Sequence, residues 1–201
     1  MEQILRNDWF TTERYGEKAE EALKKASNFY LERQTNTSKD YRFYVTQYSH
    51  FLSDLIISAT LMREVVAKTQ SGWSVYTLLN RHRDDLNRNN PNVVSPETVH
   101  SSDNIFMFGF EFLGDLNFTR SDFEFRDLFV QAVVDFVKNG DPNGSSQQKF
   151  VKATKQNLFA YTELDSTPKI KNGIFEDVHN FWEAMVRDYK YDIIFGVPLK
   201  R

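Results

Sequence analysis

Four histidines are the residues of this 201-residue chain best suited to acid–base chemistry, because cysteine is absent. An imidazole accepts and releases protons near neutral pH, so a histidine beside a cleft can serve as general base and acid. His100 lies in VHSSDNIFMFG, between a polar loop and an apolar run, with Asp103 close behind. This setting predicts a ring that points into a cleft while Asp103 orders the local backbone. The alternative is a loop histidine bonded to a carbonyl.

The other three histidines fit structural roles. His50 and His179 fall on predicted helices, where a surface or packed side chain is the ordinary outcome. His82 lies in RHRDD, which indicates a solvated cluster of charges. No two histidines have the spacing of metal ligands and no thiolate is available, so we expect neither a metal site nor another cofactor.

A serine nucleophile on an α/β sheet needs the sequence G-x-S-x-G, because the strained turn tolerates no side chains beside the serine. The chain has no such pentapeptide. Ser74 in GWSVY and Ser146 in GSSQQ each lack the second glycine, and Ser74 falls inside a predicted strand. Walker loops, dinucleotide-binding glycines and H-E-x-x-H are also absent. We therefore expect neither Ser74 nor Ser146 to serve as a nucleophile for His100.

Two helical regions are predicted in the first third of the chain. Residues 11–33 are rich in good helix formers, with Thr11 or Thr12 as the N-cap. Residues 41–68 predict two helices, or one helix with a break at 58–60. The residues of the second region expected to be buried are Phe51, Leu55, Ile56, Leu61, Met62 and Val65.

Two further helices are predicted after His100. Residues 121–138 predict an amphipathic helix that starts at Ser121 or Asp122 and stops at Gly140. Residues 173–191 predict the last helix. The expected buried stripe of the first consists of Phe125, Leu128, Phe129, Ala132, Val133 and Phe136.

Strand signals lie between the helices. Residues 73–80 are short, aromatic and apolar almost throughout, which predicts a strand buried on both faces of a parallel sheet. A long polar loop, 81–99, then leads to His100, and residues 158–165 and 168–173 predict strand and turn. The order of elements predicts an α/β fold, with helices covering a parallel sheet.

The composition of the chain indicates which kinds of binding partner to expect. The net charge is −3 and the basic residues are scattered, so we expect no electrostatic binding to nucleic acid or to an anionic membrane. Small organic molecules or other proteins are the partners that this composition favours. No apolar run is long enough to span a bilayer, and the charged opening residues do not predict a signal peptide. Sequons at Asn36, Asn117 and Asn143 predict N-glycosylation in a secreted or lumenal parent.

Several stretches together resemble the C-terminal part of the type-B carboxylesterase and cholinesterase family, which are α/β-hydrolases. VHSSDNIFMFG resembles the family's histidine motif closing on Phe-Gly, and FVKNGDPNG resembles the phrase that closes its next helix. GWSVYTLLN resembles its penultimate core strand, and QNLFAYTELDSTPKIKNGIFEDVHNFWEAM resembles its final strand, turn and helix. The resemblance covers 41–185 and is looser over 1–40. The resemblance therefore implies that residues 1–201 form the C-terminal portion of one carboxylesterase domain. It implies part of an α/β-hydrolase fold, with helices packed on a few strands of an incomplete central sheet.

The resemblance implies roles for particular residues. His100 falls on the catalytic general base and acid, and Asp103 on the buried acidic residue just after it. The substrate implied for a complete enzyme is a small-molecule carboxylic ester. The serine and acidic members of the triad are expected upstream of this chain, so we expect no turnover from the chain alone. Ser58 and His179 occupy the positions of a cysteine pair in cholinesterases, so that disulfide is missing.

Other interpretations remain open. The chain also fits a non-catalytic adhesion relative, resembling neuroligins or tactins, or a truncated gene product without activity. Residues 173–191 predict a possible dimer helix, although Phe175, Phe181, Trp182 and Met185 suit its own core equally well. A complete family member would be secreted or lie in the lumen of the endoplasmic reticulum.

Overall fold

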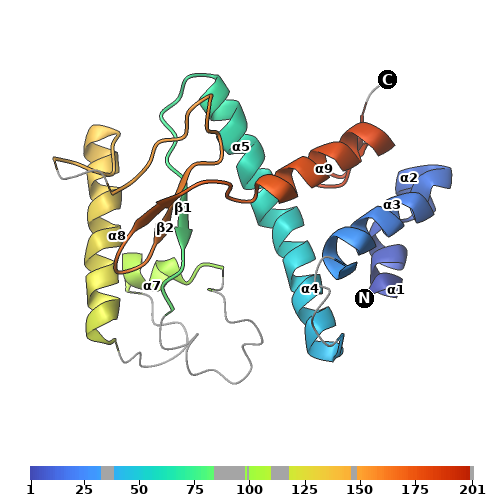
Figure 1. Ribbon diagram of the computed structural model, residues 1–201, viewed down its shortest axis with the longest axis horizontal. Coiled ribbons are helices and arrows are strands. Elements are labelled where there is room, and N and C mark those ends of the chain that lie inside the picture. The colour runs from blue at the N-terminus through green and yellow to red at the C-terminus, as the bar shows by residue number, and fades with distance from the viewer. Residues whose placement is uncertain (33–38, 84–97, 99, 110–117, 146–148, 200–201) are drawn as a thin grey trace. The chain divides into compact units, whose positions relative to one another are not determined.

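The computed structural model describes residues 1–32, 39–83, 98, 100–109, 118–145 and 149–199. The chain forms two compact units, one made of Met1–Glu64 with Phe175–Arg201 and the other of Val65–Ile174. The first unit is mainly helical, and the second combines helices with a small sheet (Figure 1). Within the described residues, no helix combines the length and the apolar character needed to cross a bilayer.

The first unit begins with short helical segments rather than the continuous helix predicted over 11–33. Gly16 interrupts the run because its φ of +58° lies in the left-handed region that glycine adopts at little cost. Thr11 is the N-cap of the second helix, as predicted, but its side chain makes no capping hydrogen bond. The segments are α1 (Glu2–Ile4), a π turn (Leu5–Trp9), α2 (Thr12–Tyr15), a 3₁₀ turn (Gly16–Lys18), α3 (Ala19–Ser27) and a second π turn (Asn28–Glu32).

A long helical run follows, made of α4 (Tyr41–Ser53), a π turn (Asp54–Ser58) and α5 (Ala59–Gln70). Asp40 caps it by accepting a hydrogen bond of 3.0 Å from the amide of Phe43. The helix is irregular at this π turn, which lies mostly before the break predicted at 58–60, because Ala59 and Thr60 already belong to α5.

The π turn also corrects two expected core positions. Ile56 and Leu61 are 64% and 39% exposed, whereas Leu55 and Met62 are 4% and 0% exposed. A π turn places an extra residue in the helix and so rotates the apolar face that regular helical spacing predicts. Of the residues expected to be buried, Phe51, Leu55, Met62 and Val65 are buried.

The last helix, α9 (Glu176–Tyr189), completes the core of the first unit, and a hairpin of β4 (Tyr191–Asp192) and β5 (Val197–Pro198) follows it. Trp182 and Phe51 are fully buried, with ring centroids 6.0 Å apart. Phe175, Phe181 and Met185 pack into the same cluster. The apolar face of α9 therefore serves its own core, and a dimer through this helix stays a prediction.

The second unit holds a three-stranded sheet in the order β1 (Leu78–Asn80), β2 (Tyr161–Leu164) and β3 (Lys169–Lys171). β1 runs parallel to β2, and β3 runs antiparallel to it. The parallel pairing and the strand–turn over 158–173 were predicted correctly.

The length and burial predicted for the strand over 73–80 are wrong. Only its last three residues pair as a strand, and these are half-buried. Tyr76 forms an isolated bridge to Lys152, and Trp73 is 63% exposed. An apolar run predicts burial, but only the residues that find a paired neighbour become a strand.

Two helices pack with this sheet: α7 (Asp103–Phe108) and α8 (Arg120–Asn139). α8 begins one residue earlier than Ser121, at a capping box formed by Thr119 and Asp122, and ends at Gly140 as predicted. Of the expected stripe, Phe125, Phe129 and Ala132 are buried, Leu128 and Val133 are half-buried, and Phe136 is 43% exposed. The buried core residues of this unit are Phe106, Phe125, Phe129, Ala132, Phe150 and Leu164.

Candidate functional site

His100 is exposed on the turn that leads into α7. The next residue, Ser101, has a φ of +66°, a conformation that side-chain-bearing residues rarely adopt. Ser102 is buried and is the N-cap of α7. Asp103 is the first residue of that helix and is half-buried, not buried as the resemblance implied. The turn thus presents the His100 ring to solvent from a tightly bent backbone.

Asn80, the last residue of β1, anchors this turn on both sides of His100. The backbone oxygen of Asn80 accepts a hydrogen bond of 2.6 Å from the Thr98 hydroxyl. Its side-chain Nδ2 donates to Ser102 Oγ at 3.5 Å, near the upper limit for such a bond. Because α/β sheets bind ligands at the carboxyl ends of their parallel strands, His100 is held where chemistry usually occurs.

The prediction that His82 belongs to a solvated charge cluster is wrong. Its side chain is 4% exposed and lies between two carboxylates. Nε2 is 2.6 Å from Asp122 Oδ1, and Nδ1 is 2.8 Å from Asp165 Oδ1. A ring that carries protons on both nitrogens donates to both carboxylates. The charges around His82 in the sequence therefore do not describe its surroundings in the fold.

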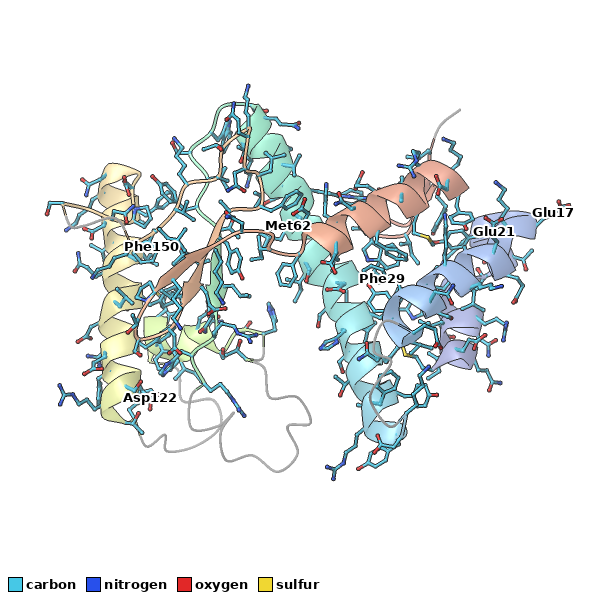
Figure 2. The ribbon with its side chains drawn as sticks, viewed as in Figure 1. Glu17, Glu21, Phe29, Met62, Asp122 and Phe150 are labelled. Carbon is cyan, nitrogen blue, oxygen red and sulfur yellow. The ribbon has the colours of Figure 1, made fainter. Side chains whose placement is uncertain are left out.

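The two carboxylates differ in their surroundings. Asp122, labelled in Figure 2 at the start of α8, is fully buried, and its Oδ2 accepts bonds of 2.7 Å from both the amide and the hydroxyl of Thr119. Asp165 follows β2, and its side chain is 50% exposed. Partial burial tends to raise the pKa of Asp165, but hydrogen bonds from His82 and the Ser166 amide hold that pKa below its usual value.

Two aromatic rings also pack against the His82 ring. The Phe125 ring stacks on it with centroids 4.4 Å apart and planes 7° apart. The Phe106 ring, from α7, meets it edge-on at 5.5 Å. These contacts fix the imidazole in one plane and exclude water from it.

Two local signals in the sequence point to this cluster. Leu78, Asn80 and His82 alternate in the manner of one face of a strand that continues past its paired end. The spacing Thr119-x-x-Asp122 is a capping-box pattern, which places a carboxylate at the start of the helix. Neither signal reveals that the two segments meet, since 40 residues separate His82 from Asp122.

The other predicted candidates take the following places. His50 on α4 and His179 on α9 are half-buried helix residues, as expected, and burial lowers the pKa of His179. Ser74 is exposed and lies outside β1, so it does not sit in a strand as predicted. Ser146 lies outside the described residues. No cluster of three metal-ligating side chains occurs in the part of the chain that the structure describes.

Of the three predicted glycosylation sites, Asn36 and Asn117 lie outside the described residues. Asn143 is half-buried, and its amide closes a loop. Nδ2 donates to Asp141 Oδ1 and to the Phe150 oxygen, while Oδ1 accepts from the amides of Lys149 and Phe150. Attachment of a glycan at Asn143 would disturb these bonds, so modification there is compatible with this loop only if the loop rearranges.

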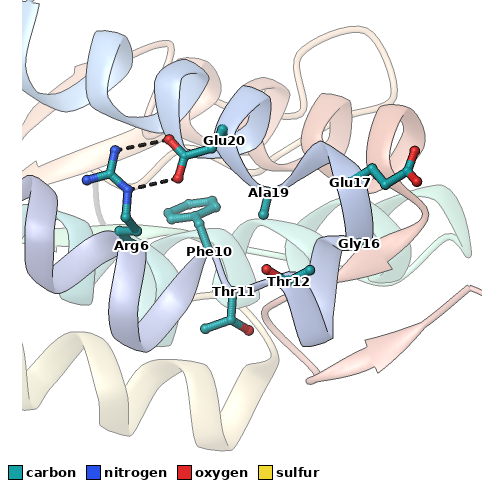
Figure 3. Close-up of a pocket in the computed structure, with 8 residues that line it drawn as sticks. All are labelled: Arg6, Phe10, Thr11, Thr12, Gly16, Glu17, Ala19 and Glu20. Atoms are coloured by element: carbon teal, nitrogen blue, oxygen red, sulfur yellow. Dashed lines mark hydrogen bonds and ion pairs between the residues drawn. The ribbon is translucent and has the colours of Figure 1, made fainter.

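A hollow of about 410 Å³ lies in the first unit, next to Gly16 (Figure 3). Arg6 borders it and forms a bidentate ion pair with Glu20, at 2.8 and 3.0 Å. No histidine lines the hollow, and its charged pair is already satisfied, so it offers no acid–base group comparable to His100. The residues that line it are Arg6, Phe10, Thr11, Thr12, Gly16, Glu17, Ala19 and Glu20.

Comparisons with known proteins agree on one family. The family model described as "Carboxylesterase family" matches residues 1–182. Gut esterase 1 of Caenorhabditis briggsae and that of Caenorhabditis elegans are each 20% identical to the chain over 198 residues. These matches cover 96% of this chain and 35% of each relative, so the chain spans about a third of their length.

A solved structure supports the same fold. The crystal structure of a Geobacillus stearothermophilus carboxylesterase matches with a TM-score of 0.56 and 15% sequence identity. The match covers 79% of this chain and 31% of that enzyme. The predicted fold class, part of an α/β-hydrolase fold with helices and an incomplete sheet, is confirmed.

Proposed function

This chain belongs to the carboxylesterase family, and we propose that His100 acts in it as the general base and acid of carboxylic ester hydrolysis. In this reaction the imidazole takes the proton from a serine hydroxyl as the serine oxygen attacks the ester carbonyl. It then gives that proton to the departing alcohol. A water molecule attacks the acyl-enzyme with the same assistance and releases the acid.

The observation that supports this role is the placement of His100. Its side chain is exposed on a turn that hydrogen bonds fix to the carboxyl end of β1, from Thr98 on one side and to Ser102 on the other. A general base must reach its partner at hydrogen-bonding distance, which requires both an accessible ring and a fixed backbone. His82, by contrast, is engaged at both ring nitrogens and 4% exposed.

The proposal assigns the nucleophile and the acidic triad member to polypeptide outside these 201 residues. The sequence contains no G-x-S-x-G, and in α/β-hydrolases the serine and the acid precede the histidine along the chain. The names of the Caenorhabditis relatives support esters as the substrate class. The isolated 201-residue chain is then expected to bind substrate poorly and to have no serine to acylate.

A fluorophosphonate probe tests this assignment, since it reacts covalently with an activated serine. The purified 201-residue chain should give no adduct by mass spectrometry. An adduct on any serine of the chain would contradict the assignment. Sequencing of the transcript upstream of Met1 should show an in-frame G-x-S-x-G followed by an acidic motif.

A further inference from the structure

We propose that His82 is a positioning residue for His100: its buried bridge between Asp122 and Asp165 fixes the end of β1, from which Asn80 holds the His100 turn. The inference rests on the proposed role of His100. It assigns a function to a side-chain cluster that the hydrolytic steps themselves do not use.

The bridge joins elements that are distant in sequence. His82 follows β1, Asp165 follows β2, and Asp122 lies in the first turn of α8. The two nitrogen–oxygen distances, 2.6 Å to Asp122 and 2.8 Å to Asp165, are in the range of charge-assisted hydrogen bonds. Asp122 is held in turn by Thr119, so the imidazole is tied to the helix cap itself. One side chain thus fixes two strand ends and a helix start.

The bridge reaches the His100 turn through Asn80. The backbone N–H of His82 donates to Asn80 Oδ1 at 2.9 Å. This bond determines the orientation of the amide, because only the oxygen end can accept, and it leaves Nδ2 to face Ser102 Oγ. The Asn80 backbone oxygen meanwhile accepts from the Thr98 hydroxyl. Both flanks of His100 therefore depend on where His82 holds Asn80.

A second connection runs through the aromatic rings. The Phe106 and His82 rings meet nearly perpendicular to each other, and Phe106 belongs to α7, the helix that begins directly after the His100 turn. Phe106 also packs edge-on against Phe125, with centroids 4.8 Å apart, and Phe125 stacks on His82. A shift of the imidazole would move α7 as well as Asn80.

The consequence for catalysis is specific. A misplacement of about 1 Å far from the reacting atoms can cost about 100-fold in rate, because a general base acts only within a narrow range of distances. His100 acts in the chemical steps, so a displaced turn should lower kcat. KM should change little, because His82 is buried away from solvent and cannot touch the substrate.

Hydrogen exchange of the 201-residue chain tests the positioning directly. We compare His82→Gln and Asp165→Ala with Asp127→Ala, a matched loss of an exposed carboxylate on α8. In the first two variants the amides of residues 100–105 should exchange at least tenfold faster. In Asp165→Ala, whose wild-type carboxylate is half-exposed, the amides of residues 126–136 should keep their protection. Asp127→Ala should match the wild-type chain. Unchanged exchange at 100–105 in Asp165→Ala overturns the proposal even if His82→Gln fails to fold.

A matched pair of Thr98 variants tests the hydrogen bond between Thr98 and Asn80. Thr98→Val removes the hydroxyl with little change of shape, and Thr98→Ser restores it. Faster exchange at residues 100–105 in the first variant, with wild-type exchange in the second, is expected. Equal exchange in the two variants overturns the claim that this hydrogen bond holds the His100 turn.

Kinetics of the ester-hydrolysing polypeptide separate positioning from general stability. Asp165→Ala should lower kcat between tenfold and 100-fold and leave KM within about twofold of wild type. A changed KM at constant kcat, or no change in either, overturns the proposal. If the wild-type polypeptide hydrolyses no ester, the proposed function of His100 fails, whereas the exchange results still decide whether His82 positions the turn.

Discussion

His82 and His100 differ in the physical properties that decide what a histidine can do. His82 is 4% exposed and engaged by a carboxylate at each nitrogen, whereas His100 is exposed on a turn. The charged residues beside His82 in the sequence predict a solvated side chain, which is the opposite of its burial in the fold. A buried ring in a satisfied network stabilises the fold, and an accessible ring on a fixed backbone is free to exchange protons.

At this scale we predict that His82→Leu destabilises the second unit. Removing the imidazole leaves Asp122 Oδ1 buried without its hydrogen-bonding partner, which costs about 3 kcal/mol. Urea unfolding should show this loss as a lower midpoint. His100→Gln should change the free energy of unfolding by less than about 0.5 kcal/mol, since the replaced side chain is exposed. Similar stabilities of the two variants would contradict the burial described for His82.

Ser101 gives a second prediction at the residue scale. Its φ of +66° disfavours β-branched side chains strongly and favours glycine. Ser101→Val should destabilise the chain by about 2 kcal/mol, although the side chain is exposed and loses no packing. Ser101→Gly serves as the matched control and should lie within about 1 kcal/mol of wild type. If valine is tolerated as well as glycine in thermal unfolding, the turn does not have this backbone.

At the scale of elements, the π turn between α4 and α5 holds an unusual carboxylate. Asp54 lies in this turn and accepts a hydrogen bond of 3.2 Å from the Tyr30 hydroxyl. Burial raises the pKa of Asp54 to about 6, more than its hydrogen bonds from Ser58 and Tyr30 lower it. The folded chain therefore holds a proton on Asp54 that the unfolded chain has already lost at pH 5.

This raised pKa predicts how stability depends on pH. The stabilisation is fully present below the unfolded pKa of about 3.9 and is lost as the pH rises through the folded pKa. Asp54→Asn removes the charge, so its stability relative to wild type should grow by about 1 kcal/mol between pH 5 and pH 8. Urea unfolding of both proteins at the two pH values measures this difference. A difference that is constant or shrinks with pH would contradict the burial of Asp54.

The helices were more predictable than the strands for a physical reason. α8 and α9 carry amphipathic patterns, and α8 also has clear end signals, so their existence follows largely from local sequence. The start of α8 was placed too late because Thr119, not Ser121, accepts from the Asp122 amide. β1 was predicted too long because apolar content alone does not specify which residues find a hydrogen-bonded neighbour.

At the scale of the whole molecule, the family could be identified from the sequence, whereas the His82 bridge could not. The motif around His100 and the phrase near Gly140 point to the carboxylesterases, and the match over residues 1–182 confirms the family. The burial of His82 depends on partners 40 and 83 residues away, and local patterns do not encode such a meeting. Local motifs thus miss the contacts of this fold that join residues distant in sequence.

The division into two units also has a consequence for function. Each unit has its own cluster of buried aromatic and aliphatic residues, and His100, His82 and both carboxylates all belong to Val65–Ile174. The elements that hold the proposed catalytic histidine therefore lie within a single unit. The chain spans about a third of its relatives' length, so the remaining parts of a catalytic centre are proposed to come from polypeptide outside it.

The most direct test of the account is the rate at which a fluorophosphonate labels the native polypeptide that contains these residues. That polypeptide should carry a reactive serine, and His100→Gln should slow its labelling by at least about 1,000-fold, because the serine loses its general base. His50→Gln, a matched change on α4, should label at the wild-type rate. Unchanged labelling of His100→Gln, or a native polypeptide without a reactive serine, would contradict the role assigned to His100.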